Sequence, residues 1–353
     1  MQAQNMKLIL LSLFLLFSQV ITLSDTIHEE IHEDSQFPKV VTLDDQSVLV
    51  FSSIIGEKKC LETKLDKKGE YIYGDIPHTQ GLSGSDLLTS PHDGTNKNSI
   101  LFHHGDLPYE MVTTYNQNTL LSSVKEPKSR YFAHKSIVAL KSGKIVIAGI
   151  VGGSNENVLT DVDINIYDPT TQTFGTGLTF GANGKLVSCY EHKENQVYCA
   201  FVSQQYPFVS KLILQHIEVN SNANTMASKS SQVIKTFYTV FNYLKAVPFS
   251  DTQAIILFRV GNGEALPKYG NSGQDLFFYQ YELSNEEGAL VKGIRYESLV
   301  KVYESNKNDP DTCRFRKDEE DESIDIAVLS PKRIYIACET GVGKLNGFII
   351  YPE

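Results

Sequence analysis

A zinc-protease-like pattern stands near the start of the chain, where residues 28–32 read His28-Glu29-Glu30-Ile31-His32. On a helix, the spacing H-E-x-x-H puts two histidines on one face, where they can bind zinc beside a glutamate that acts as a base. No apolar helix face surrounds these residues, and no third ligand of recognisable spacing follows nearby. We therefore interpret the segment as an exposed acidic N-terminus.

Three other patterns are incomplete. His103 and His104 follow an apolar run, but adjacent residues of a strand point to opposite faces, so the pair cannot bind one metal from a regular strand. The loop Gly81–Ser85 misses the G-x-S-x-G nucleophile elbow by one position, and Gly261–Gly263 lacks the strand-to-helix context of a phosphate loop. The sequence thus predicts no catalytic residue, no metal site and no cofactor.

The N-terminus carries a secretion signal. Lys7 precedes an apolar run from Leu8 to Phe17, and small or polar residues follow it. This pattern predicts a signal peptide over residues 1–23 and a polar segment over residues 24–37. The run is short for a membrane span and no later run approaches the required length, so we expect a protein secreted or released into the lumen of the secretory pathway.

The charge balance excludes one class of partner. The formal net charge is -10 and the sequence pI is about 5.4, whereas nucleic-acid binding depends on clustered Lys and Arg. We expect no nucleic-acid partner. The acidic run Asp318–Glu322 predicts a solvated loop, with a cation-attracting patch as the alternative.

Five cysteines fit an oxidising compartment. Cys189 and Cys199 flank a predicted hairpin turn near Glu194, so they lie opposite one another and a cross-strand disulfide is possible. The second predicted pair is Cys313 with Cys338, which leaves Cys60 free. The alternative for each cysteine is a small buried apolar residue.

The segment Ile137–Phe174 predicts a small antiparallel sheet. Two apolar runs surround Ser142-Gly143, a loop with Gly152-Gly153 follows, and alternating apolar residues lead to an Asp168-Pro169 turn. This layout resembles a single kelch repeat, with Phe174 where the family usually has Trp. The resemblance implies a β-propeller, a scaffold that kelch-like proteins use for binding and, in a few cases, for copper-dependent oxidation.

The same unit recurs along the chain. Similar runs start at residues 40, 87, 137, 186, 246 and 326, which lie 47, 50, 49, 60 and 80 residues apart. A period near 40 to 50 is typical of four-stranded blades. We predict one all-β propeller domain over residues 38–353, with about six four-stranded blades, or seven if Gly288–Phe315 forms a degenerate one. We expect an N-terminal strand to close the ring by completing the last blade.

The main functional hypothesis is a secreted, non-enzymatic binding or scaffolding module. Its partner would be a protein or glycan held by blade-connecting loops, especially Gly261–Gly273 and Asn306–Glu322. One alternative is an extracellular enzyme on the same scaffold, copper-dependent or carbohydrate-active. Another is a surface-coat or matrix component that binds calcium. The sequence does not fix the oligomeric state.

Overall fold

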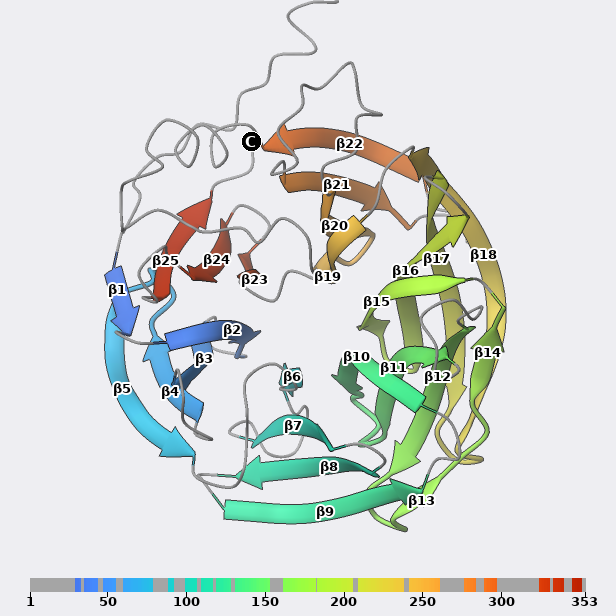
Figure 1. The fold of residues 1–353 in the computed structure, drawn as a ribbon, viewed down its shortest axis with the longest axis horizontal. Helices are drawn as coiled ribbons and strands as arrows, with labels where there is room; N and C mark the ends of the chain where they lie inside the picture. The colour runs from blue at the N-terminus through green and yellow to red at the C-terminus, as the bar shows by residue number, and fades with distance from the viewer. Residues whose placement is uncertain are drawn as a thin grey trace, which may run out of the picture.

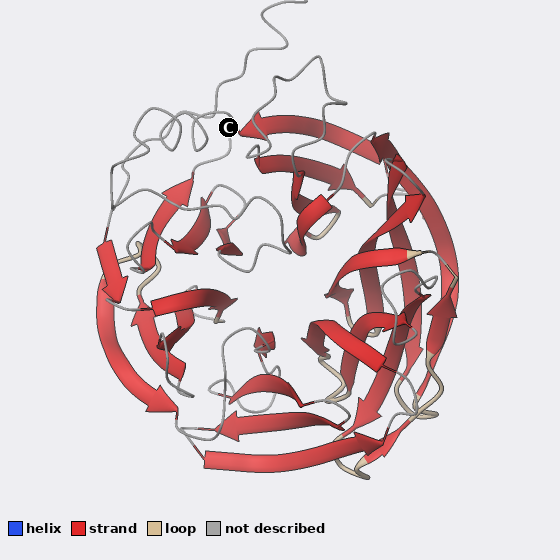
Figure 2. Ribbon diagram, in the orientation of Figure 1, coloured by secondary structure: helices blue, strands red, loops and turns tan. Residues whose placement is uncertain are grey.

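The structure is a computed structural model of the chain. It describes residues 29–32, 35–43, 47–54, 60–78, 88–91, 99–106, 109–116, 119–127, 131–152, 161–181, 183–205, 209–237, 241–260, 276–283, 289–296, 324–330, 333–339 and 345–350. Figure 2 shows strands and their connecting turns in this part of the chain, and none of the described residues is helical.

Six antiparallel sheets lie around a common centre like the blades of a propeller (Figure 1). Blade 1 has the order β2 (Ser35–Thr42), β3 (Val48–Ile54), β4 (Cys60–Leu65) and β5 (Tyr71–His78). Blade 2 has β6 (Leu88–Pro91), β7 (Ser99–Asp106), β8 (Tyr109–Asn116) and β9 (Thr119–Pro127). Blade 3 has β10 (Tyr131–Ala139), β11 (Ile145–Gly152), β12 (Asp161–Asp168) and β13 (Thr173–Phe174), with β14 (Leu178–Phe180) also paired to β12.

The second half of the chain repeats this plan. Blade 4 has β15 (Gly184–Lys193), β16 (Gln196–Gln205), β17 (Val209–Asn220) and β18 (Thr225–Phe237). Blade 5 has β19 (Phe241–Ser250), β20 (Gln253–Val260), β21 (Leu276–Glu282) and β22 (Ala289–Tyr296). Blade 6 has β23 (Ile324–Ser330), β24 (Arg333–Glu339) and β25 (Leu345–Ile350), and its fourth strand is β1 (Glu29–His32).

The predicted all-β propeller is confirmed, with six sheets among the described residues. The segment considered for a seventh blade, Gly288–Phe315, contributes β22 to blade 5, and its residues 297–315 lie outside the described ranges. The predicted polar segment 24–37 contains β1 and the start of β2. Because β1 pairs with β25, the first described strand completes the sheet that the last three strands begin.

Blade 3 illustrates why these sequences form strands. Its second strand, β11, is paired on both sides and reads IVIAGIVG, a continuous apolar run of the kind that suits a strand buried on both faces. Val146, Ile147 and Ala148 are completely buried. The turn before β11 uses Gly143 at φ 79°, where a side chain would be strained, and the amide of Gly143 donates to the Leu140 oxygen at 2.8 Å.

The apolar core consists of layers between neighbouring blades. One layer joins blades 3 and 4, a second joins blades 4 and 5, and a third joins blade 6 to blade 1. The largest fully buried side chains are aromatic, namely Tyr167, Tyr335, Phe51 and Phe241. In a chain without Trp, Tyr and Phe therefore supply the large rings of these layers.

Candidate functional site

The first strand of each blade is an edge strand that faces the centre of the ring (Figure 1). These six inner strands are β2, β6, β10, β15, β19 and β23. Along such an edge, main-chain N–H groups have no neighbouring strand to bind, and a buried N–H without a partner is costly. Polar side chains near these edges can therefore accept hydrogen bonds from these N–H groups.

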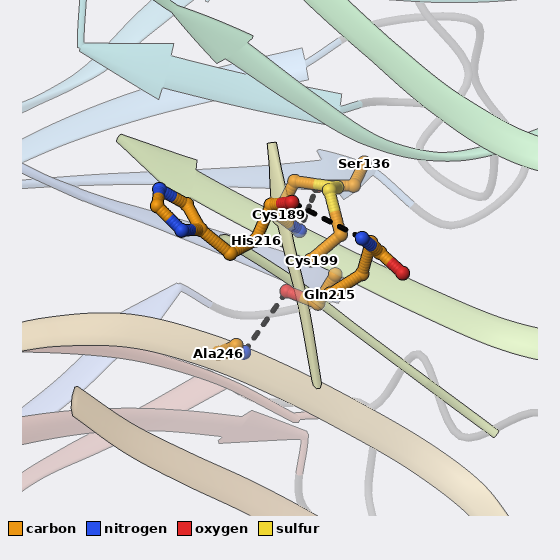
Figure 3. The surroundings of a disulfide bond; sticks show 7 residues. Ser136, Cys189, Cys199, Gln215, His216 and Ala246 are labelled. Carbon is orange, nitrogen blue, oxygen red and sulfur yellow. Dashed lines mark hydrogen bonds between the residues drawn. A yellow bond between two sulfur atoms is a disulfide. The ribbon is translucent and has the colours of Figure 1, made fainter. Parts of the chain in front are cut away.

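Serine hydroxyls accept such hydrogen bonds in two blades. The Ser136 hydroxyl accepts a hydrogen bond from the Cys189 amide of the next blade at 2.9 Å, as Figure 3 shows. The Ser188 hydroxyl accepts one from the Ala246 amide of the blade after that, also at 2.9 Å. Both serines are buried. Each donating amide belongs to the residue directly after one that contacts the following blade: Cys189 follows Ser188, and Ala246 follows Lys245.

Ser136 and Ser188 occupy equivalent positions in the first strands of their blades, and three other blades have a residue at the same position. We call this the latch position. It holds Ser136 in blade 3 and Ser188 in blade 4. In blade 5 it holds Lys245, which directly precedes Ala246. In blade 6 it holds Asp325, which accepts a hydrogen bond from the Val40 amide of blade 1. In blade 1 it holds Lys39, which directly precedes Val40. The latch residues are listed here in chain order: Lys39, Ser136, Ser188, Lys245 and Asp325. Blades 3 and 4 thus use neutral latches, whereas blades 5, 6 and 1 use charged ones.

Two of the charged latches, Lys245 and Asp325, meet in a polar cluster, the Asp325 cluster, which also contains Tyr243 and the Val40 amide. The Lys245 ammonium lies 3.0 Å from Oδ1 of Asp325 and 3.3 Å from Oδ2. The Val40 amide donates to Oδ2 at 2.8 Å, and the Tyr243 hydroxyl donates to Oδ1 at 3.3 Å. One carboxylate therefore joins three blades through four contacts.

The members of the Asp325 cluster differ in burial. The side chain of Asp325 is 4% exposed, whereas that of Lys245 is 27% exposed. Burial raises the pKa of Tyr243 well above its ordinary value, and the charge of Asp325 and the hydrogen bond to it raise the pKa further. Tyr243 therefore keeps its proton and acts as a donor. Lys245 is the member of the Asp325 cluster that a ligand can reach.

The chemistry of this arrangement follows from Lys245. An ammonium group offers three donors, and the bonds to Asp325 hold it in place without enclosing it. A fixed cation at a partly dry site can stabilise negative charge on a substrate oxygen. Sequence analysis did not identify Tyr243, Lys245 or Asp325. For Lys245 and Asp325 the signal was a polar residue directly before an apolar run, a pattern that also occurs before Val40 and Ile137.

The H-E-x-x-H pattern does not form the helix that zinc binding requires. Glu29–His32 is the strand β1, with a register shift between Glu30 and His32 in its pairing with β25. His28 lies outside the described residues. Within the part of the chain that the structure describes, no three His, Cys, Asp or Glu side chains gather as a metal-ion site.

The other sequence candidates are placed only in part. His103 and His104 are neighbours in β7, opposite Val112 and Met111 of β8. Three predicted loops lie outside the described residues, namely Gly81–Ser85, Gly261–Gly273 and the whole of Asn306–Glu322 with its acidic run Asp318–Glu322. Of these candidates the structure thus places only His103 and His104, in blade 2.

The predicted disulfide between Cys189 and Cys199 is present (Figure 3). The two residues are direct partners across β15 and β16, with their Cα atoms 4.1 Å apart. The turn itself lies at Glu194-Asn195, between the paired residues Lys193 and Gln196. A register shift between Glu191 and Lys193 brings the two cysteines opposite each other, as a turn centred on Glu194 would.

Cys338 is also disulfide-bonded. Of the five cysteines, Cys60 and Cys313 remain, and the side chains of neither are described. We expect the pair Cys313–Cys338. Tryptic digestion without reduction, followed by mass spectrometry, should then give the peptide 308–314 linked to the peptide 334–344. A link from 334–344 to the peptide 60–64 would contradict the prediction.

A histidine, His192, lies at the interface of blades 4 and 5. His192 Nε2 lies 2.6 Å from the main-chain oxygen of Asp251, and the rings of Tyr190 and Tyr198 lie edge-on to the imidazole. Burial lowers the pKa of His192, opposed by the bond to Asp251, and Lys193 and Lys141 lower it further. The folded protein therefore binds this proton less readily than the unfolded chain does.

We therefore expect acid to destabilise the wild type through His192. As pH falls from about 7 to about 5, the unfolded chain takes up the proton first, so the free energy of unfolding falls. The variant His192→Gln should lose less stability over this range. Urea unfolding at both ends of the range measures the difference, and parallel losses in the two proteins would argue against a contribution from His192.

No known protein family and no curated protein sequence matches this chain. Solved structures do match. A protein of unknown function from Dyadobacter fermentans has a TM-score of 0.58 at 10% identity, covering 94% of this chain and 99% of that one. A Hadza microbial sialidase has a TM-score of 0.54 at 9% identity, covering 92% and 68%. A neuraminidase-like protein of A/little yellow-shouldered bat/Guatemala has a TM-score of 0.51 at 10% identity, covering 93% and 98%.

At these identities the likeness shows a shared propeller fold. It nevertheless corrects the main functional hypothesis: a non-enzymatic binding or scaffolding module is contradicted, because the similar structures include a sialidase and a neuraminidase-like protein. The alternative of an extracellular enzyme on a propeller scaffold fits these findings better. No helix among the described residues is long and apolar enough to cross a bilayer.

Proposed function

We propose that this chain is an extracellular carbohydrate-active enzyme whose active centre is the Asp325 cluster. The observation that carries the proposal is that Lys245 differs from the other latch residues in its binding partner and in its exposure. Ser136, Ser188 and Asp325 bind main-chain amides of the next blade, whereas Lys245 binds a side chain and stays partly exposed. A cation held in this way at the inner edge is suited to contact a ligand.

The roles of the three side chains follow from their contacts. Lys245 would donate to a substrate oxygen and stabilise the negative charge that develops there. Asp325 would hold the ammonium group through both of its oxygens. Tyr243, protonated and buried, would fix the carboxylate from its other side. Lys245 is thus the proposed catalytic residue, and the other two are positioning residues.

The names of the similar structures support carbohydrate chemistry over the copper-dependent alternative. The described cysteines Cys189, Cys199 and Cys338 are disulfide-bonded, so none of them offers a thiolate to copper. Their oxidised state agrees with the predicted signal peptide and with secretion.

We also propose a kelch-like character for blade 3, supported by the ring contact of Tyr167 with Phe174 at 5.0 Å between centroids.

The experiment is a substrate panel. The secreted protein is incubated with neutral and acidic oligosaccharides, and products are separated by liquid chromatography with mass detection. A reduced and heat-unfolded sample of the same preparation is the control. Catalysed cleavage of at least one saccharide, lost in the control, is the expected result. Folded protein that leaves every saccharide intact would overturn the proposal.

A further inference from the structure

The inner strands carry positive charge in an acidic protein. Their six sequences contain five lysines, Lys39, Lys135, Lys185, Lys193 and Lys245, against Glu191 and Asp325. Their net charge is thus +3, although the whole chain has -10 and the other nineteen strands together have -4. The field of a protein follows where its charges lie, so a surface lined by one sign attracts the opposite sign.

Lys39 connects this charge to the Asp325 cluster. The Val40 amide, which directly follows Lys39, lies 2.8 Å from Oδ2 of Asp325. Covalent geometry then places the Cα atom of Lys39 within about 5.5 Å of that oxygen. Lys39 is partly exposed, and it forms no ion pair with any residue that the structure describes.

Among the described residues, the charges of the latch positions around Asp325 do not cancel. Its carboxylate balances the ammonium group of Lys245, with which it is paired. Lys39, at the latch position of the next blade, supplies a second cation. Counted over the described residues, the three charged latches of blades 5, 6 and 1 thus carry one net positive charge.

We propose that this face of the inner strands binds an acidic oligosaccharide, with the carboxylate of one sugar contacting Lys39 and Lys245. This inference rests on the proposed function and names its substrate class. A single carboxylate matches the one excess charge. A long polyanion such as nucleic acid is disfavoured, because the rest of the chain is strongly negative and would repel it.

The test measures binding by isothermal titration calorimetry. Sialyllactose and trigalacturonate are the acidic probes, lactose and maltotriose the neutral ones, and a short single-stranded DNA the polyanion. We expect an acidic probe to bind at least tenfold more tightly than its neutral counterpart, with affinity that falls as salt rises. Lys39→Met should weaken binding about tenfold.

The matched control is Lys144→Met, which removes a partly buried lysine paired with Asp168 in the β10–β11 turn. It should leave binding unchanged. Equal affinity for acidic and neutral probes, tighter binding of DNA, or no effect of Lys39→Met would each overturn the inference. Cleavage of neutral saccharides alone would overturn it while leaving the proposed function intact. Carboxylate binding that needs Lys39, without cleavage of any saccharide, would support the inference and refute the proposed enzymatic function.

Discussion

Replacing Asp325 by alanine should lower the free energy of unfolding by about 3 to 5 kcal/mol. The substitution removes the acceptor of the Val40 amide and the Tyr243 hydroxyl, and it leaves the Lys245 ammonium without its counter-ion. Breaking a buried pair by removing one partner is costly, because the remaining charge and donors lose their compensation. Urea unfolding followed by intrinsic tyrosine fluorescence measures the loss.

A second carboxylate serves as the matched control. Glu218 pairs with Lys229 across β17 and β18, and both side chains are about half exposed. Water screens such a pair and solvates either partner when the other is removed, so Glu218→Ala should cause no measurable change in stability. If Asp325→Ala proves as mild as Glu218→Ala, then Asp325 does not join the three blades in the way described.

Removing the disulfide of blade 4 should cost about 2 to 3 kcal/mol of folding free energy. The bond links residues that are 10 positions apart, and it restricts the unfolded chain, while the native hairpin keeps its main-chain pairing. The double variant Cys189→Ala/Cys199→Ala tests this in the same unfolding assay. The wild type unfolded under reducing conditions should lose more stability than the double variant does, because reduction also breaks the bond of Cys338.

The location of this bond sharpens the test. Cys189 donates its amide to Ser136, and the neighbouring Ser188 accepts from Ala246, so blade 4 contacts both of its neighbours beside the disulfide (Figure 3). These contacts use main-chain amides and serine hydroxyls, which the double variant retains. Its fold should therefore be unchanged. A double variant as stable as the oxidised wild type would show that the crosslink contributes nothing.

The fold and this disulfide were predictable because their signals are local. Short apolar runs around polar turns predict paired strands, and their spacing predicts blades. Cys189 and Cys199 belong to one hairpin, so the position of its turn predicts their pairing. The structure confirms both the all-β propeller and the bond.

The Asp325 cluster was not predictable in this way. Asp325 lies 285 positions from Val40 and 82 from Tyr243, and only the closed arrangement of blades brings them together. A pattern was nevertheless present, since Lys39, Ser136, Lys245 and Asp325 each directly precede an apolar run. Without the structure, a polar residue before an apolar run does not indicate which distant group it contacts. The structure shows these partners for Ser136, Lys245 and Asp325.

The most direct test of the proposed active centre compares two lysine–aspartate pairs in the activity assay. Lys245 pairs with Asp325 on the inner strands, and Lys144 pairs with Asp168 in blade 3, where its side chain is 15% exposed. With the best substrate of the panel, Lys245→Met should lower kcat/KM by about 100-fold or more. Lys144→Met should stay within about twofold, because it lies outside the proposed centre. Full activity of Lys245→Met, or an equal loss in both variants, would contradict the account.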